Sequence, residues 1–362
     1  MRQVAEQVGI SIKSVSRVLN GEPGVSAATA EQILMAAQDL GFRRNDLARN
    51  LRRGNRTETV GLVLRHSSTR FYDDLIEGVE EVADLHGALV ITASSRSPER
   101  ERATLLALSS RRVDGLLIVP TGDDQAFLRP EQSGGMALVF VDRPPTGLAA
   151  DSVLADDAGG GRAATNHLLS HGHRRIGVIG ASPRLHTVSE RVRGHHVALR
   201  ARGIGLDNCL LDLDNDGAAA ARAATVRLLS SPVPPTALFT LNNVCTIGAA
   251  RALRDLGAHR RVALVGFDDF ELADLLDPPV TVVQHDVVGM GRVAAARLFA
   301  RIGGADGPAE TVVLATALVP RGSGELPGPP ASAVVPRRGR DRSRRDWYGG
   351  PAPGSPGTRP TD

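Results

Sequence analysis

The sequence predicts an α/β protein in which a three-helix helix-turn-helix domain precedes a body of two Rossmann-like lobes, each built on a parallel sheet. The chain has 362 residues, of which 42% are hydrophobic, so two or three domains can each bury a core. The first 44 residues show apolar spacing typical of short helices. From residue 59, apolar β-type runs alternate with helical stretches, and this series restarts after Asp157.

Three short helices are expected within residues 1–44. Gly9 separates the first from the second, Asn20-Gly21 ends the second, and Ser26 can cap the third, which we expect to end at Gly41. Two short helices joined by a glycine-containing turn and followed by a supporting helix are typical of helix-turn-helix DNA-binding domains. The apolar faces expected are Val4, Ala5 and Val8, then Val15, Val18 and Leu19, then Ala30, Ile33, Leu34, Ala37 and Leu40.

The second helix would lie in the major groove of DNA. Lys13 can donate to a guanine edge, and Ile12 can cover a thymine methyl group. Residues 1–56 carry nine Lys and Arg against five Asp and Glu, whereas residues 57–320 are net negative, so the head is the part suited to a polyanion. The DNA contacts expected from this helix are Ile12, Lys13, Ser14, Ser16, Arg17 and Asn20.

A basic segment, residues 45–56, joins the head to the body. Asn45 is a good N-cap, and Leu47 and Leu51 are spaced for one face of a helix. A helix this short is marginal in water, so we expect it to fold when docked on DNA, with Leu51 as an apolar wedge in the minor groove. The alternative is a solvated basic linker.

The sequence of the body, from residue 57 onward, predicts two lobes that face each other across a cleft. Its apolar runs lie at 60–64, 88–93, 114–120 and 136–142, and then at 175–180, 209–214, 236–241 and 262–269; late strands are expected at 281–286 and 311–319. Continuous apolar strands between helices indicate parallel sheets covered on both faces. Ligand sites in such sheets lie at the carboxyl ends of the strands, and therefore in the cleft.

Polar and aromatic residues follow several of these strands. Arg, Asn and Asp side chains that converge on one cleft suit the hydroxyl groups of a polar ligand. Tyr72, the only tyrosine before residue 348, gives such a ligand a flat face, although a packed helix cap explains it equally well. The candidates are Phe71, Tyr72, Asp142, Arg143, Thr187, Arg191, Asn242 and Asp268.

Several classes of enzyme and metal protein are disfavoured. Lys13 is the only lysine, which excludes a P-loop lysine, and no dinucleotide fingerprint follows the first strand. The glycine run 159–161 lacks the fingerprint spacing, so we expect it to ease entry into a packed helix. The stretch 212–217 resembles the start of an EF-hand, but Ala223 stands where the bidentate Glu belongs. The histidines and the two cysteines lack metal-ligand spacing, so we expect no cofactor, no metal and no enzyme.

The chain start lacks the apolar run of a signal peptide, and no stretch is long and apolar enough to cross a membrane, so we expect a cytoplasmic protein. Residues 324–362 are rich in Pro, Gly, Arg and Ser, which predicts a disordered tail. The basic cluster at 337–345 within it is read as solvated, with DNA contact as the alternative.

Two segments, SVSRVLNG at 14–21 and NDLARNLR at 45–52, resemble the LacI/GalR family of bacterial repressors, and the likeness extends over residues 1–323. It implies a periplasmic-binding-protein-like core with chain crossings near 156, 285 and 311. Lobe 1 would then comprise 57–156 and 286–310, and lobe 2 would comprise 157–285 and 311–323. It also implies base reading by Ile12, Lys13 and Arg17, minor-groove entry by Ala48, Arg49 and Leu51 of the hinge helix 45–56, and effector binding by Arg191 and Asp268.

The chain departs from the family pattern in places. Met1-Arg2-Gln3 stands where a capping Thr usually opens the first helix, and Arg44 replaces a proline before the hinge. Asn243 stands where the family usually has an Asp that contacts the effector. Leu185 stands where some purine-sensing members have Arg, which argues against a purine.

Together these observations predict a ligand-responsive repressor that binds a near-palindromic operator as a C2 homodimer. We expect it to be controlled by a small polar effector, a sugar, bound between the lobes. The alternative is a cytoplasmic solute-binding receptor without a transcriptional role.

Overall fold

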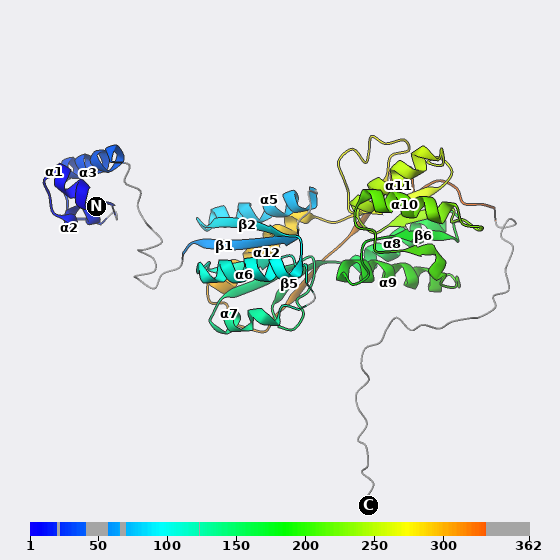
Figure 1. Cartoon of the computed structure of the whole chain (residues 1–362), viewed down its shortest axis with the longest axis horizontal. Coiled ribbons are helices and arrows are strands. Elements are labelled where there is room, and N and C mark those ends of the chain that lie inside the picture. The colour runs from blue at the N-terminus through cyan, green and yellow to red at the C-terminus, as the bar shows by residue number, and fades with distance from the viewer. Residues whose placement is uncertain (20–21, 41–56, 66–69, 123, 331–362) are drawn as a thin grey trace, which may run out of the picture.

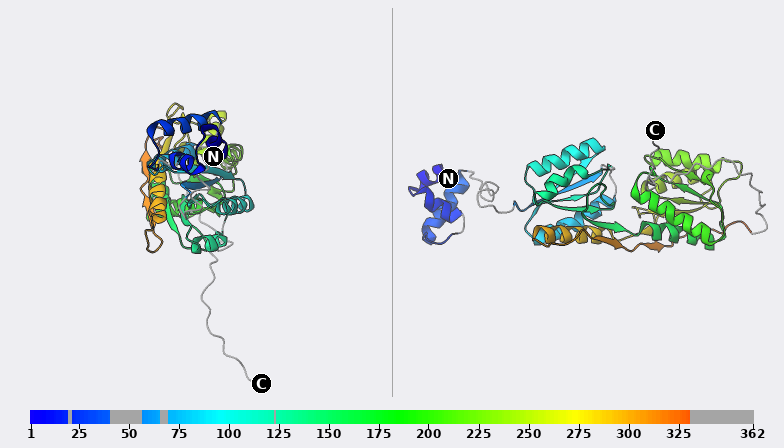
Figure 2. Two further views of the ribbon diagram at one scale, coloured as in Figure 1. Left: turned by 90° about the vertical axis from the view of Figure 1, so that its left-hand side faces the viewer. Right: turned by 90° about the horizontal axis from the view of Figure 1, so that it is seen from below.

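The computed structural model describes residues 1–19, 22–40, 57–65, 70–122 and 124–330, which form a helical head and two α/β lobes (Figure 1). The lobes lie side by side and are joined by several crossings of the chain (Figure 2). Within these described ranges no helix is long and apolar enough to cross a membrane.

The head consists of α1 (Arg2–Val8), α2 (Ile12–Leu19) and α3 (Ala27–Asp39), which confirms the three expected helices. Gly9 ends α1 in the left-handed region at φ 72°, and Ser26 caps α3 by accepting from the N–H of Thr29. Met1 makes no side-chain cap, as the missing Thr predicts. The core is formed by Val4, Ala5, Val15, Ile33, Ala36 and Ala37.

The expected apolar face of α3 is wrong in part. Leu34 is 53% exposed and Leu40 is 42% exposed, whereas Ala36 is buried in their place. The buried stripe follows residues 33, 36 and 37, so Leu34 is rotated out of the core, and Leu40 lies beyond the last helical residue, Asp39.

Lobe 1 is a six-stranded parallel sheet in the order β11-β5-β4-β3-β1-β2. One face is covered by α5 and α12 and the other by α6, with α7 at one side (Figure 1). Its elements are β1 (Thr59–Arg65), α5 (Arg70–Leu85), β2 (Leu89–Ser95), α6 (Pro98–Ser110), β3 (Gly115–Ile118), η1 (Ala126–Leu128), α7 (Arg129–Ser133), β4 (Ala137–Val141), β5 (Asp151–Ala155), α12 (Val287–Ile302) and β11 (Thr311–Leu314).

Lobe 2 repeats this plan, with its strands in the order β12-β10-β9-β8-β6-β7 and only β12 antiparallel to its neighbour. The expected strand at 209–214 is shorter in the structure, because residues 208–210 form a 3-10 turn before it. The elements are α8 (Asp157–Ser170), β6 (Ile176–Ile179), α9 (His186–Ala201), η2 (Asn208–Leu210), β7 (Leu211–Asp212), α10 (Ala218–Leu229), β8 (Ala237–Thr240), α11 (Asn243–Asp255), β9 (Ala263–Phe267), β10 (Thr281–Gln284) and β12 (Ala317–Val319).

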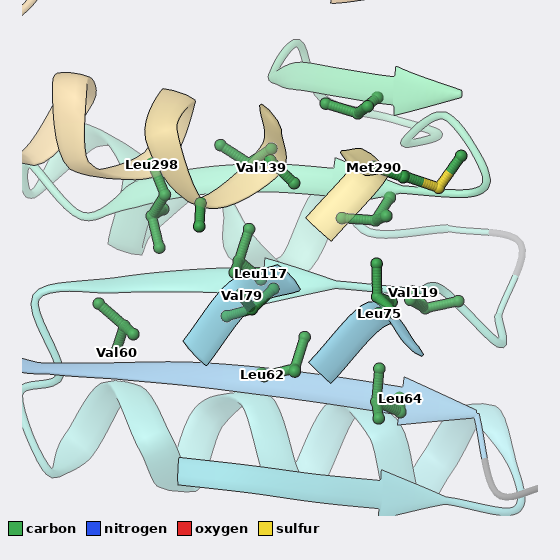
Figure 3. Close-up of a cluster of buried hydrophobic side chains, with 14 of the residues drawn as sticks. Val60, Leu62, Leu64, Leu75, Val79, Leu117, Val119, Val139, Met290 and Leu298 are labelled. Atoms are coloured by element: carbon green, nitrogen blue, oxygen red, sulfur yellow. The ribbon is translucent and has the colours of Figure 1, made fainter. Parts of the chain in front are cut away.

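Each lobe has an apolar core on both faces of its sheet. In lobe 1, alternate residues of the central strands, such as Leu62 and Leu117, point toward Leu75 of α5 and Met290 and Leu298 of α12 (Figure 3). The intervening residues, such as Val63 and Leu116, pack under α6. Burial on both faces explains why these strands read as continuous apolar runs.

The chain crosses between the lobes three times. It passes from β5 to α8, from β10 to α12 and from β11 to β12, so the first two crossings lie near residues 156 and 285. The third was expected near 311, with 311–323 in lobe 2. Instead β11 pairs with β5 of lobe 1, and the crossing lies at residues 315–316. The apolar run 311–319 is therefore two strands in two sheets.

Residues 324–330, expected to begin a disordered tail, are packed against lobe 2. The Glu325 carboxylate accepts from Thr281 and contacts His167, and the carbonyl of Leu326 lies 2.9 Å from Nε2 of His173. The N–H of Gly328 donates to the carbonyl of His171. This stretch has the composition of a loop, but it is held in place by contacts with His167, His171 and His173, which lie far away in the sequence. Residues 331–362 lie outside the described ranges.

Candidate functional site

The exposed side of α2 carries the residues expected to read DNA. Val15 is buried in the head, which turns Ile12, Lys13 and Arg17 to solvent; Ile12 is 51% exposed although it is apolar. Ser11 caps the helix by accepting from the N–H of Ser14, and Oγ of Ser14 lies 3.0 Å from Oγ of Ser11. The hydroxyl of Ser14 is therefore engaged at the start of the helix, where a groove-reading helix approaches bases.

The remaining DNA contacts expected from the sequence, Asn20, Asn45, Ala48, Arg49 and Leu51, lie outside the described residues. Ser16 is half-buried beside the exposed face of α2.

All eight cleft candidates line one cavity of about 110 Å³ between the lobes, which confirms that they converge in space. Phe71, Tyr72, Asp142 and Arg143 come from lobe 1, and Thr187, Arg191, Asn242 and Asp268 come from lobe 2. The cavity is smaller than the roughly 300–1,000 Å³ of pockets that hold drug-sized ligands.

Asp142 and Asp268 occupy equivalent places in the two lobes. Asp142 follows β4 and Asp268 follows β9, the third strand in the order of each sheet. Both residues have positive φ, 68° and 64°, and their N–H groups donate to Val153 and Val283 of the neighbouring strand. This bent backbone turns each carboxylate out of the sheet and toward the cavity.

Arg191, one turn into α9, is 4% exposed and is held by several acceptors. Its Nε donates to Asp157 at 2.6 Å, and its Nη1 donates to the carbonyl of Leu241 at 2.6 Å and to Asp268 at 3.1 Å. The guanidinium also stacks on Phe267, 3.6 Å from the ring centroid. This set of contacts orients one edge of Arg191 and the carboxylate of Asp268 for a ligand.

Asp157 is a component of the site that the sequence analysis missed. It is buried at the start of α8, and burial raises the pKa of its carboxyl to about 7, against the opposing attraction of Arg191. One arginine shared by Asp157 and Asp268 cannot fully compensate two carboxylates in a buried place. No local motif marks Asp157, because its partner lies 34 residues later in the chain.

The lobe 1 wall of the cavity is less tightly bonded. Arg143 donates from Nη1 to the carbonyl of Pro120 at 2.7 Å, and its Nε lies 3.3 Å from Asp142. Arg65, the last residue of β1, also lines the cavity and was missed by the sequence analysis. Tyr72 is buried among these groups, and burial, with Asp142 nearby, raises the pKa of its phenol to about 12, so the hydroxyl stays neutral.

The other lining residues have local roles. Oδ1 of Asn242 caps α11 by accepting from the N–H of Cys245, which leaves its amide N–H groups to face a ligand. Thr187 is buried in the first turn of α9, whereas Leu185, just before that helix, contributes an apolar surface. Asn243 also lines the cavity, at the position where a family aspartate was expected.

The EF-hand-like stretch is a turn of lobe 2 that is held by hydrogen bonds. Asn215 is buried and donates to the carbonyls of Gly180 and Asp212, which fixes residues 212–217 against the sheet. Asp216 is thereby presented to Arg65 of lobe 1, at 3.8 Å. In the part of the chain that the structure describes, no three His, Cys, Asp or Glu side chains are placed to hold a metal ion.

Comparison with known proteins finds family matches for both the head and the body of the chain. Residues 1–45 match the family model of bacterial regulatory proteins of the lacI family, and residues 165–324 match a periplasmic binding protein-like domain. The transcriptional regulator PtxS of Pseudomonas aeruginosa is 34% identical, over 89% of this chain and 95% of its own length. The regulator CelR of Thermobifida fusca is 32% identical over 90% of this chain and 98% of its own length. Both relatives are transcriptional regulators.

Two solved structures extend the likeness to the fold. A complex of the regulator CelR with cellobiose superposes with a TM-score of 0.69 at 32% identity, covering 89% of this chain and 98% of that one. The lac repressor dimer bound to operator and the anti-inducer ONPF superposes with a TM-score of 0.77 at 25% identity, with the same coverage.

Proposed function

We propose, from the premise that this chain belongs to the lacI family of bacterial regulatory proteins, that it is a transcriptional repressor controlled by a small polar effector. The observation that carries this proposal is the combination of two sites in one chain. An exposed recognition helix bears Lys13 and Arg17, and a cavity between two lobes is lined by Arg191, Asp268 and Asn242.

The effector is proposed to be a carbohydrate. The cavity combines charged and amide groups that bind hydroxyls with the aromatic surfaces of Phe71 and Tyr72, a composition that suits a ring carrying several hydroxyl groups. Because residues from both lobes line the cavity, a ligand changes the balance between lobe arrangements only by its differential affinity for them. The basic segment 45–56, with Leu51 as a minor-groove wedge, is the proposed link between the lobes and the head.

The active form is proposed to be a C2 homodimer on a near-palindromic operator, in the cytoplasm where the chromosome lies. On lobe 2, α11 and residues 270–280 enclose an apolar surface groove of about 340 Å³, beside which Leu275 is 74% exposed. Arg251 and Arg254 lie on the same rim as Glu271 and Asp277. A two-fold contact between copies needs one surface that complements itself, and a rim with both charges meets that need.

The DNA-binding part is tested by selecting duplexes from a random pool with the full chain and measuring affinities for the selected operator and for random DNA. We expect Lys13→Ala to weaken operator binding by about 1–3 kcal/mol and to relax the preference at one base pair in each half-site. Random DNA should be bound nearly as before, because phosphate contacts dominate there.

Arg2→Ala is the matched control, since Arg2 is an exposed cation of the head that pairs with Glu6 on α1. A failure to select any near-palindromic sequence would refute the proposal that the protein is a repressor. Equal losses on operator and random DNA for Lys13→Ala would make Lys13 a phosphate contact.

A further inference from the structure

The three arginines that line the cavity differ in how completely they are bonded. Arg191 is engaged by Asp157, Asp268 and the carbonyl of Leu241. Arg143 is 9% exposed, and its buried Nε has no hydrogen-bond partner among the described residues; the ion pair with Asp142 at 3.3 Å lacks hydrogen-bond geometry. A buried donor without an acceptor costs free energy unless a ligand supplies one.

Arg65 extends this pattern on the same wall of lobe 1. Among the described residues Arg65 pairs with the carboxylate of Asp216, across the cleft at 3.8 Å, which is beyond hydrogen-bond distance, and the side chain of Asp216 is almost fully solvated. An ion pair of this kind is weak and exchanges readily for a better acceptor. Arg65 therefore has donors to offer to a molecule in the cavity.

The charge of the lining points in the same direction on the lobe 1 wall, where Arg65 and Arg143 face one carboxylate, Asp142. On the lobe 2 side Arg191 is shared by Asp268 and the buried Asp157, so it adds no free positive charge. The excess positive charge therefore lies on the lobe 1 wall, and an anionic group bound there would balance it.

We propose that the effector is an anionic carbohydrate, a sugar acid or a sugar phosphate, whose anionic group binds between Arg65 and Arg143 of lobe 1 while its hydroxyls bind Arg191, Asp268 and Asn242 of lobe 2. The inference rests on the proposed function, because it assumes that the cavity is the effector site. Arginine binds carboxylate and phosphate groups through parallel N–H donors, so both anions fit the same two side chains.

The test compares matched ligand pairs that differ in the anionic group, on the full chain. D-Glucuronate and D-glucose 6-phosphate are each compared with D-glucose, D-galacturonate with D-galactose, and D-ribose 5-phosphate with D-ribose. Binding is measured by the rise in Tm and by calorimetry. We expect an anionic member of at least one pair to bind and its neutral partner to bind at least about tenfold more weakly; the uronate and phosphate arms distinguish the two anions.

Arg65→Gln should weaken the anionic ligand by about tenfold or more, and Arg65→Lys should restore part of that loss because the charge returns. Arg70→Gln is the matched control, since Arg70 is an arginine of lobe 1 that lies outside this cavity lining. It should leave the affinity unchanged.

Neutral sugars that bind as well as the acids, an unaltered affinity in Arg65→Gln, or a panel in which no anionic member binds would each overturn this inference. If a neutral sugar binds and Asp268→Asn abolishes that binding while Arg65→Gln does not, the proposed function stands and only the anionic class fails. If ligand binds equally well to Asp268→Asn and Arg65→Gln, the cavity is not the effector site and the proposed function fails with it.

Discussion

Lobe 1 and lobe 2 start one helix from the same sequence pattern but surround it with different chemistry. Residues 156–162 and 286–292 both read Asp-x-x-Gly-x-Gly-Arg. The first aspartate caps α8 by accepting from Gly159 at 2.8 Å, and its counterpart caps α12 by accepting from Gly289 at 2.7 Å. Gly161 and Gly291 then let a neighbouring helix approach so closely that a Cβ would strike its backbone carbonyl.

The carbonyl that Gly161 approaches belongs to Arg191 of α9, and the carbonyl that Gly291 approaches belongs to Leu75 of α5. The residue that follows the capping aspartate also differs between the lobes: it is charged in lobe 2, Asp157, and apolar in lobe 1, Val287. Where lobe 2 buries an ion pair, lobe 1 has the buried Leu75 and the half-buried Val287 in one apolar cluster. The comparison teaches that the close contact between these helices is a packing device common to both lobes, and that lobe 2 adds a buried charged pair to it.

The largest effect is expected from making lobe 2 resemble lobe 1 at one position only. Arg191→Leu leaves Asp157 buried without its cation, so the free energy of unfolding should fall by about 3–5 kcal/mol, measured by denaturant titration. Arg191→Leu combined with Asp157→Val reproduces the lobe 1 pair and should recover most of that loss, since well-packed apolar pairs replace buried ion pairs at little cost. A double variant as unstable as the single one would show that the two lobes do not share a packing plan.

A smaller effect is expected from the shared glycines. Gly161→Ala and Gly291→Ala each insert a methyl group against a backbone carbonyl, and each should lower the free energy of unfolding by about 1–3 kcal/mol. Only Gly161→Ala displaces the backbone of Arg191, so only this variant should also weaken effector binding at a temperature where both are folded. Gly159→Ala and Gly303→Ala are less informative, because neither glycine lies where one helix approaches the backbone of another. Equal effector affinities in the two variants would show that the close contact between α8 and α9 does not position Arg191 for effector binding.

The smallest effect concerns pH. The pKa of Asp157 is raised to about 7, so between pH 4 and 7 the folded protein holds a proton that the unfolded chain has released, and stability falls as the pH rises through this range. Asp157→Asn cannot titrate. The unfolding free energy of the wild type minus that of this variant should therefore decrease by about 1 kcal/mol or more from pH 4 to 7 and stay flat above. An increase over that range would mean that Arg191 lowers the pKa.

Much of this arrangement was predictable from the sequence, because local patterns encode it. Buried parallel strands read as apolar runs, and the rule that ligand sites lie at their carboxyl ends brought Asp142, Asn242 and Asp268 together correctly. The same rule applies to Arg65 at the end of β1 and would have found it. The glycine run 159–161 was correctly interpreted as the entry to a packed helix.

What was missed depends on contacts between distant residues. Asp157 acts through Arg191, and residues 324–330 are held by His167, His171 and His173, which no local pattern connects. The division of 311–319 into β11 and β12 could not be seen in an unbroken apolar run, because hydropathy does not say which sheet a strand joins.

The late crossing at residues 315–316 has a consequence for the order in which the protein is made. The helices of the head end at Asp39, so the head leaves the ribosome early, whereas lobe 1 lacks an edge strand until Leu314 has been synthesised. Lobe 2 waits still longer, for β12 and for the Glu325 contacts with His167 and Thr281. Domains fold as they emerge during translation. A nascent or prematurely terminated chain would thus carry a folded DNA-binding head before either lobe is complete.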